Sequence, residues 1–509
     1  MIAGPLSKET FHMEEESFGK PDILEKYPEY ASTALLDELR FREYGYLDEQ
    51  GHTYLDYTGS GLAARAQLKA HHDRLARTTF GNPHSINPTS LSSTGAIEAT
   101  RLRVLSFFNA SPEEYDVIFT PNATGAARLV GEAYPFTKEK RYIYTADNHN
   151  SIVGFREFAR RSGSRFKLVP LSGSDLRIDR KAVVKALKGK ALRARCKGSK
   201  GPRGHRGLFA YPAQSNFSGV QHPLEWVELA QREGYDVLLD VAAYIPTNAL
   251  DLSKVKPDFL IASWYKVFGY PTGVGCLIAR RDALSRLVRP WFSGGTVEMV
   301  TISKAWHKML QGGHGYEDGT VNFLSIPDVH FGLDWVSGIG MDTIKTRVKC
   351  LTGHFLDQLR ELKHSDGSPM VQLFGPDNTE SRGGTVTFQV LDARGQPVDE
   401  RIIDAESASA GISLRTGCFC NPGAGEVALD FQHPKLPSLI SILYKNTMSR
   451  TKWTPEELIR ARVRQTLRAI RVSFGLASTV GDVDKIVSFV ETYRDRTPNA
   501  DDFPPRGGC

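Results

Sequence analysis

The sequence predicts an α/β protein, with a large domain built on a mostly parallel seven-stranded sheet and a smaller α+β domain after it. Short apolar runs alternate with amphipathic stretches in the first two thirds of the chain. From residue 331 the pattern changes to a long helical stretch followed by strand-like runs. The 509 residues are 40% hydrophobic and 24% charged, which is typical of a globular chain with a sizeable core.

Seven apolar runs of the first domain are expected to form buried strands. They are 116–120 (DVIFT), 141–146 (RYIYTA), 166–171 (FKLVPL), 207–212 (GLFAYP), 235–241 (YDVLLDV), 258–264 (DFLIASW) and 275–279 (GCLIA). Helical spacing of apolar residues between them predicts helices over 123–136, 151–163 and 224–234. Strands joined by such crossover helices form a parallel sheet covered by helices.

The second domain begins with a predicted helical stretch over 331–362. Strands over 383–391 and 470–475 and a closing helix over 480–494 follow it. We therefore expect four parts: an amino-terminal polar arm (1–40), a large domain (41–330), a small α+β domain (331–495) and a flexible polar tail (496–509).

The net charge of +6 is concentrated in one place. Residues 181–206 contain ten Lys or Arg and no acid, and removing these ten would leave 6 − 10 = −4. A glycine-containing basic block of this kind is typical of a solvated loop inserted in a domain. It lacks the interleaved aromatic residues of single-strand binding surfaces, so we do not expect a nucleic-acid partner.

The amino terminus has no apolar signal core, and no run approaches the roughly 18 apolar residues of a membrane span. These features predict a cytoplasmic protein without a membrane segment. The six cysteines are too sparse for a disulfide scaffold. They also form no pair of CxxC motifs, so we expect no metal site.

Lys266 follows an apolar strand and precedes a glycine-rich turn in SWYKVFGYPTGVG. A lysine that is partly desolvated at a strand end loses its proton more readily, as a Schiff-base lysine must. The alternative is a lysine whose head reaches solvent at the sheet edge. Asp240 ends the preceding strand, where open α/β sheets bind their ligands. It could pair with a protonated pyridine nitrogen or cap a helix.

Residues 122–125 (NATG) connect a strand to a helix. Small residues at a helix start expose backbone N–H groups that can bind phosphate, and Thr124, Gly125 and the hydroxyl of Ser263 are the candidates. Thr124 could equally be a helix cap.

Two further polar residues end predicted strands. His149 could stack on a flat cofactor and exchange protons, or it could be structural. Asn216 is a neutral donor suited to a phenolic oxygen or a substrate carboxylate.

The late segment SLRTGCFCNPGAG places Cys418 and Cys420 beside Arg415 in a loop punctuated by Gly and Pro. Arg415 is suited to a bidentate contact with a substrate carboxylate. A nearby cation also favours a reactive thiolate, whereas the alternative is a buried structural cysteine.

Together these segments resemble the class V aminotransferase family of fold-type I pyridoxal phosphate enzymes. Within it they resemble the cysteine desulfurase branch, and most of all the amino-terminal domain of molybdenum cofactor sulfurases. The segments that carry the resemblance are YLDYTGSGL (54–62), GNPHS (81–85), DNHNSIVG (147–154), YPAQSNFSG (211–219), SWYKVFGYPTGVG (263–275), GYEDGTVNFLSI (315–326) and RTGCFCNPGA (415–424).

The resemblance implies roles for the candidate residues. Lys266 would carry pyridoxal 5'-phosphate, Asp240 would pair with its pyridinium, and His149 would stack on the ring and move protons. Thr124, Gly125 and Ser263 would contact the phosphate, while Arg415 and Asn216 would bind substrate. Gly319 and Thr320, in EDGT, would reach the phosphate of a neighbouring subunit, which implies a homodimer.

The implied activity is removal of sulfur from L-cysteine, with the sulfur carried as a persulfide on Cys420 and alanine released. We expect no acceptor domain beyond the small domain, so the sulfur acceptor stays open. Another enzyme of the family, such as a C–S or selenocysteine lyase or a biosynthetic enzyme using the same enamine chemistry, is the alternative. A catalytically idle protein that binds an acidic partner or RNA through the basic block is a third hypothesis.

Overall fold

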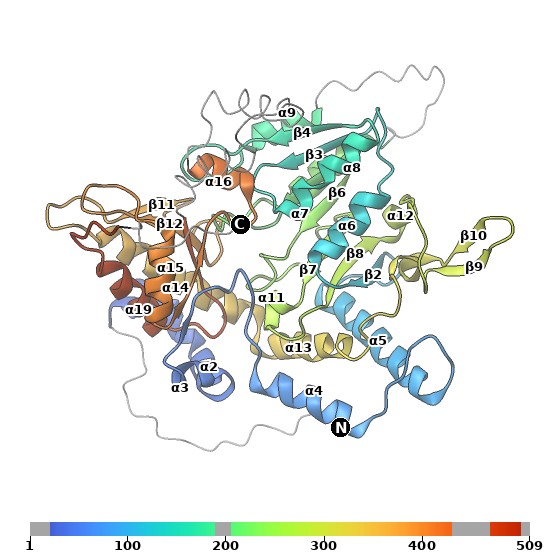
Figure 1. Ribbon diagram of the computed structural model, residues 1–509, viewed down its shortest axis with the longest axis horizontal. Coiled ribbons are helices and arrows are strands. Elements are labelled where there is room, and N and C mark those ends of the chain that lie inside the picture. The colour runs from blue at the N-terminus through green and yellow to red at the C-terminus, as the bar shows by residue number, and fades with distance from the viewer. Residues whose placement is uncertain (1–20, 189–204, 430–468, 500–509) are drawn as a thin grey trace, which may run out of the picture.

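The computed structural model describes residues 21–188, 205–429 and 469–499 (Figure 1). Its large domain is built on one seven-stranded sheet in the order β2-β8-β7-β6-β5-β3-β4. The strands are β2 (Tyr115–Thr120), β3 (Arg141–Thr145), β4 (Arg165–Val169), β5 (Gly207–Pro212), β6 (Tyr235–Asp240), β7 (Phe259–Ser263) and β8 (Gly275–Arg280). Each matches a predicted run. The strands from β4 to β7 are parallel, and β8 is antiparallel to both of its neighbours.

Helices cover both faces of this sheet, which explains its continuous apolar runs. One face packs against α6 (Ala123–Ala133), α7 (Asn150–Val153) and α8 (Phe155–Arg161). The other packs against α5 (Pro88–Phe107), α10 (Trp226–Arg232) and α13 (Ile326–Ile339). Every residue of β5, β6 and β7 is consequently buried. The predicted α/β class is confirmed.

The prediction that all seven strands are buried is wrong for β4. Four of its five residues are exposed, and the side chains of Phe166 and Leu168 are each 47% accessible. Among the described residues, β4 is the last strand of the sheet and pairs only with β3, so one of its long edges is unpaired by any described strand.

The small domain contains a four-stranded antiparallel sheet in the order β11-β12-β15-β14. Its strands are β11 (Val371–Phe374), β12 (Thr385–Val390), β14 (Arg415–Thr416) and β15 (Ile470–Ser473). The predicted helical stretch over 331–362 divides into α13 and α14 (Met341–Glu361) at Gly340, whose φ of +93° favours glycine. The closing helix is α19 (Val480–Glu491), capped reciprocally by Thr479 and Asp482.

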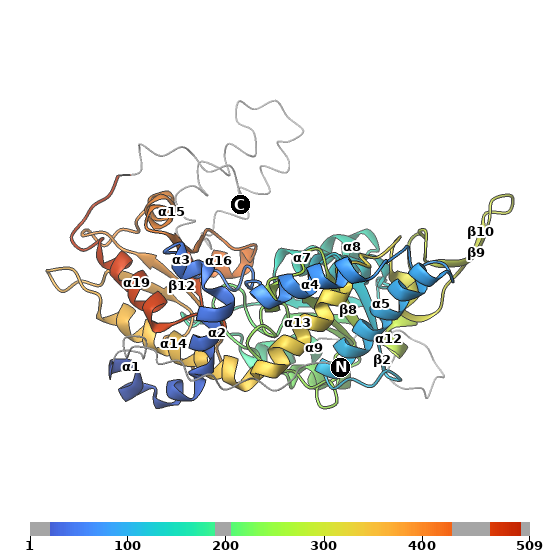
Figure 2. The same ribbon diagram turned by 90° about the horizontal axis from the view of Figure 1, so that it is seen from below.

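Residues 21–40, expected as part of a polar arm, are helical. They form α1 (Pro21–Lys26), the 3₁₀ helix η2 (Pro28–Thr33) and the start of α2 (Leu35–Tyr44). These elements lie against the small domain beside α14 and α19 (Figure 2). Tyr30, Leu36 and Leu39 are buried, so this part of the arm contributes to the core.

The basic block is only partly a loop. Residues 181–188 belong to helix α9 (Arg180–Lys188), and residues 189–204 lie outside the described residues. In the tail, which was expected to be flexible, Arg496 forms an ion pair with Glu406 (Nη2–Oε1 2.9 Å). This contact holds the first residue of the tail against the small domain. Residues 500–509 lie outside the described part of the chain. Among the described residues, no helix is both long and apolar enough to span a membrane.

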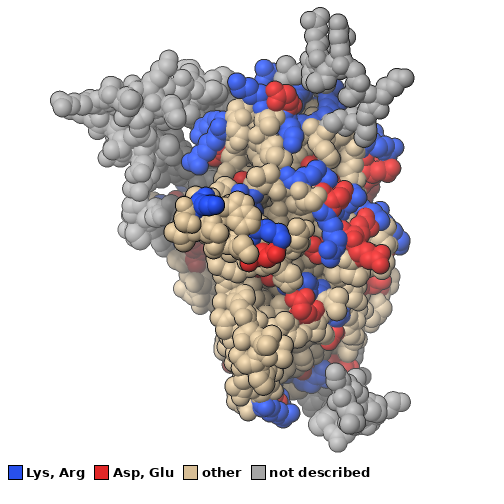
Figure 3. All heavy atoms as spheres, turned by 90° about the vertical axis from the view of Figure 1, so that its right-hand side faces the viewer, with Lys and Arg blue, Asp and Glu red and all other residues tan. Residues whose placement is uncertain are grey.

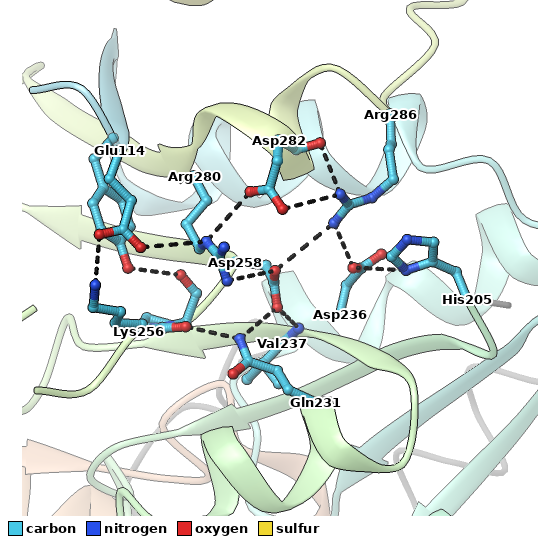
Figure 4. A network of polar contacts seen from close by, with 12 residues as sticks. Glu114, His205, Gln231, Asp236, Val237, Lys256, Asp258, Arg280, Asp282 and Arg286 are labelled. Carbon is cyan, nitrogen blue, oxygen red and sulfur yellow. Dashed lines mark hydrogen bonds and ion pairs between the residues drawn. The ribbon is translucent and has the colours of Figure 1, made fainter. Parts of the chain in front are cut away.

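The amino and carboxyl ends of the strands in the large sheet carry different side chains. The amino ends of β6 and β7 carry a network of charged side chains in which Asp236 and Asp258 meet Arg280 and Arg286 (Figure 4). The carboxyl ends of β3, β5, β6 and β7 lie at the opposite edge, and segments of the small domain contact them. This second edge carries the residues singled out in the sequence.

Candidate active site

A cavity of about 120 Å³ lies at the carboxyl ends of the parallel strands. It brings together six of the predicted site residues: Thr124, His149, Asn216, Asp240, Ser263 and Lys266. They come from five segments of the chain, spread over more than 140 positions. They meet because parallel strands end at one edge of a sheet.

Lys266 and Asp240 are two ionisable residues that line this cavity. Lys266 lies in the short helix α11 (Tyr265–Phe268) after β7, and Asp240 is the last residue of the neighbouring β6. Burial lowers the pKa of Lys266, and nearby Arg471 and Arg415 add to this, while Asp240 opposes it. Burial raises the pKa of Asp240. Burial therefore makes Lys266 lose its proton more readily. It also destabilises the Asp240 carboxylate, which a cationic partner would stabilise.

His149 caps α7 and faces the same cavity. Its Nδ1 accepts a hydrogen bond from the backbone N–H of Ser151 (3.2 Å), which assigns the proton of the neutral ring to Nε2. Burial lowers the pKa of His149 to about 4, with Lys266 and Arg471 contributing. The ring is therefore neutral near neutral pH, and it can stack as a flat neutral group.

The amino end of α6 forms the polar end of the cavity. Asn122 caps the helix by accepting from the N–H of Gly125 (2.9 Å), and the N–H of Ala123 donates to Ser263 Oγ (2.9 Å). The hydroxyls of Thr124 and Ser151 are 2.7 Å apart. A helix start with three hydroxyls around it is suited to a phosphate. Ser151 was missed in the sequence, although it lies two residues after His149.

An aspartate and two arginines lie beside this cavity. Asp56 Oδ2 accepts from Arg415 Nη2 (2.6 Å) and Nε (2.9 Å), and Asp56 Oδ1 accepts from Arg471 Nη2 (2.7 Å). Arg471 is 3% exposed, whereas the side chain of Arg415 is 51% exposed. Arg415 is therefore held by Asp56 at the edge of the site. Arg471 was missed; an arginine inside the apolar run IRVSFG was the available signal.

Cys420 is exposed on the loop after β14 and α16 (Pro422–Ala428) begins two residues later. The predicted contact residue Asn216 is engaged by this loop. Its Nδ2 donates to the carbonyl of Phe419 (2.8 Å), and its Oδ1 accepts from Asn421 Nδ2 (2.9 Å). This loop is hydrogen-bonded to the segments that follow β3 and β5.

Comparison with known proteins places the chain in a family. The family model described as aminotransferase class-V matches residues 53–486. The chain belongs to the class V aminotransferase family. The matched range includes Asp56, the whole cavity, Cys420 and Arg471, so the site lies within the family's shared region.

Among curated relatives, this family member is similar to two plant molybdenum cofactor sulfurases. It is 34% identical over 482 residues to that of Solanum lycopersicum and 32% identical over 486 residues to that of Arabidopsis thaliana. These alignments cover 90% and 89% of this chain but 57% and 58% of the relatives. The chain thus spans little more than half the length of the curated relatives it matches.

Solved structures agree on the fold. The structure superimposes on the apo cysteine desulfurase of Thermococcus onnurineus NA1 with a TM-score of 0.70. The match has 20% sequence identity and covers 89% of this chain and 97% of the other. The predicted fold type is therefore confirmed.

Gly319 and Thr320 lie away from the cavity that contains Lys266. Gly319 donates its N–H to Gly294 O (2.8 Å) at a φ of +70°. Thr320 lines a separate cavity of about 390 Å³, which also includes Gly125 and Arg128. Thr320 therefore faces a cavity that it shares with Gly125 and Arg128 of α6, apart from the cavity that contains Lys266.

Proposed function

We propose that this chain is an enzyme that binds pyridoxal 5'-phosphate, takes sulfur from L-cysteine as a persulfide on Cys420 and releases alanine. The observation that carries this proposal is that Lys266, Asp240 and His149 line one cavity. The segments at the strand ends around it also bind the Cys420 loop. The names of the curated relatives support the same sulfur chemistry.

The residues present fit this cofactor. Asp240 Oδ1 accepts from the N–H of Ala242 (2.9 Å), while its Oδ2 has no hydrogen-bond partner among the described residues and lies at the cavity. A buried carboxylate with one uncommitted oxygen suits a protonated ring nitrogen. Thr124, Ser151 and Ser263 would hold the phosphate at the start of α6, and Lys266 would carry the aldehyde carbon. When bound, the cofactor supplies an electron sink.

The chain's own residues can perform the remaining tasks. Arg471 and Arg415 present cations to the carboxylate of the amino acid, and the lowered pKa of Lys266 suits it to accept the proton from the substrate's α-carbon. Cys420 then attacks the substrate sulfur as a thiolate. The new S–S bond forms as the carbon–sulfur bond breaks, and the electron pair left on carbon is protonated to give alanine.

We further propose a homodimer as the working form. Large apolar side chains are exposed on and before the hairpin formed by β9 (Val297–Thr301) and β10 (Trp306–Met309). They include Trp291, Phe292, Met299, Ile302 and Trp306, which are 38 to 92% accessible. Figure 3 faces this side of the molecule, where a broad area has few charges. Sedimentation of the purified protein should show twice the mass of one chain, and a single-chain mass would exclude the dimer.

The sulfur acceptor and the compartment are parts of the same proposal. We propose that the sulfur passes to an acceptor that reaches the exposed Cys420, and that the enzyme works in the cytoplasm. Incubation of persulfide-loaded enzyme with candidate acceptors would show sulfur leaving Cys420. Retention of the added sulfur on Cys420 with every acceptor would contradict this transfer.

The test of the activity is mass spectrometry of the protein after incubation with the cofactor and L-cysteine. We expect one added sulfur on Cys420 and one alanine in solution per sulfur transferred. Cys418→Ser, a change in the neighbouring thiol, is the matched control and should keep both signals, whereas Cys420→Ala should lose both. Sulfide and pyruvate without a protein-bound sulfur would instead identify a C–S lyase, and wild-type alanine formation by Cys420→Ala would contradict the role of Cys420.

A further inference from the structure

Cys420 lies in an unusual backbone turn. Phe419 and Cys420 have φ values of +55° and +54°, so two successive residues with side chains adopt the left-handed conformation. This conformation is unfavourable for both residues and persists only where surrounding contacts impose it. The contacts that hold the turn are therefore part of how the thiol is placed.

Asn421, immediately after the cysteine, supplies the central contacts. It is completely buried. Its Nδ2 donates to the carbonyl of Asp147 (2.8 Å) and to Asn216 Oδ1 (2.9 Å), while its Oδ1 accepts from the N–H of Ala424 (3.2 Å) and caps α16. One amide side chain thus connects the Cys420 turn to the ends of β3 and β5.

Phe419, on the other side of the cysteine, is anchored to the same edge. Its carbonyl accepts from Asn216 Nδ2 (2.8 Å), and its ring lies 5.4 Å from that of Phe217. The guanidinium of Arg471 lies 4.8 Å from the centre of the Phe419 ring and also donates to Asn216 O (3.0 Å). The turn is therefore held on both sides of Cys420.

These contacts also surround His149. The carbonyl of Cys420 accepts from the N–H of Asn150 (2.8 Å), and Asn421 binds Asp147, so the loop is bonded on either side of the histidine. Gly423 lies so close that a Cβ there would overlap the carbonyl oxygen of Ala146. The loop and the His149 segment thus form one close-packed unit.

We propose that Asn421 is a positioning residue for the thiol: it latches the Cys420 turn to Asp147 and Asn216 and so fixes Cys420 relative to His149 and the cavity. The latch also assigns Asn216 to holding this loop. The catalytic meaning of the inference rests on the proposed function, whereas the latch itself rests only on contacts within the chain.

The test compares Asn421→Ser with the wild type. Serine keeps an oxygen that can cap α16 but removes the amide donor to Asp147 and Asn216. Hydrogen exchange of the backbone amides in 418–425 should become at least about tenfold faster, because a buried bridging donor is lost. With cofactor and L-cysteine, kcat for alanine formation should fall about tenfold while KM stays within about twofold, because positioning of the thiol and not substrate binding is changed.

Asn87→Ser is the matched control, since Asn87 caps α5 in the same way but its Nδ2 donates to the nearby Ser85 and not to a distant segment of the described chain. It should leave exchange in 418–425 and the kinetics unchanged. Gly423→Ala is a second variant that pushes the loop off Ala146 by contact alone, and it should reproduce the faster exchange. Wild-type exchange in 418–425 in both loop variants would overturn the latch. If the wild type forms no alanine, the proposed function fails, while the exchange comparison still decides the latch.

Discussion

Lys266 and Asp240 lie at the ends of adjacent strands, and burial acts on their charges in opposite directions. Burial lowers the pKa of the lysine and raises that of the aspartate. Each charge partly offsets the cost of burying the other, because the Asp240 carboxylate raises the pKa of Lys266 and Lys266 lowers that of Asp240. The reactivity of the lysine therefore depends on a neighbour 26 positions earlier in the chain.

This dependence can be measured in the protein without cofactor. Asp240→Asn removes the charge that raises the pKa of Lys266, so we expect the pKa of the lysine to fall further. The pH midpoint for acylation of Lys266, followed by peptide mass spectrometry, should move to lower pH. Lys69, whose side chain is 74% exposed on α4 (Arg65–Arg77), serves as the internal control and should not move. An unchanged or higher midpoint at Lys266 would contradict the coupling.

Some of the candidate site residues could be predicted individually from the sequence. Lys266, Asp240 and His149 each lie at or just after the end of an apolar strand, and the geometry of a parallel sheet brings such positions together. Asp56 and Arg471 could not be paired in this way. They are 415 positions apart, and their contact exists only because the small domain folds back on the amino-terminal segment.

Among the elements, the large sheet was predictable because its inner strands are covered on both faces and read as continuous apolar runs. Helix α5 was missed. Part of its buried face consists of Ser90, Ser93 and Thr100, so the apolar spacing that marks a helix is absent there. The edge position of β4 was equally hidden, because strand order is set by tertiary pairing.

A network of charged side chains lies at the amino ends of β6 and β7, apart from the candidate active site. Asp258, before β7, accepts from the N–H of Val237 (2.8 Å) and from Gln231 Nε2 (3.0 Å). Arg280 and Arg286 approach it only to 3.9 and 3.8 Å (Figure 4). Burial, with the neighbouring charge of Asp236, raises the pKa of Asp258 to about 6.

This pKa predicts a pH effect on stability. The folded state holds the proton of Asp258 more tightly than the unfolded chain, so its contribution is full at low pH and is lost as pH rises through about 6. Asp258→Asn removes this loss. Relative to the wild type, the variant's free energy of unfolding in urea should rise by about 1 to 3 kcal/mol between pH 4 and pH 7.5.

Asp282→Asn is the matched control for this change. Asp282 belongs to the same network but its side chain is 57% exposed, so replacing it should change the free energy of unfolding by less than about 1 kcal/mol at either pH. A constant difference for Asp258→Asn as well would show that Asp258 is not the titrating group.

At the scale of the whole molecule, a buried arginine of α14 binds the amino-terminal segment to the small domain. Arg347 of α14 is completely buried. It forms paired hydrogen bonds with both oxygens of Asp37 (2.7 Å each) and donates to Thr33 Oγ1 and O (2.7 Å each). Its guanidinium also lies 4.2 Å from the ring centre of Tyr30. The sequence predicted a polar arm here because partners more than 300 positions apart leave no local pattern.

Arg347→Ala should therefore destabilise the molecule out of proportion to a single ion pair. It leaves Asp37 and several buried acceptors unpaired, which costs about 3 to 5 kcal/mol of unfolding free energy. Arg360→Ala on the same helix removes an ion pair with Asp357 in which the arginine side chain is 49% exposed, and should cost less than about 1 kcal/mol. Hydrogen exchange should show residues 28–44 opening first in Arg347→Ala. Equal unfolding free energies for the two variants would mean that this segment is not anchored through Arg347.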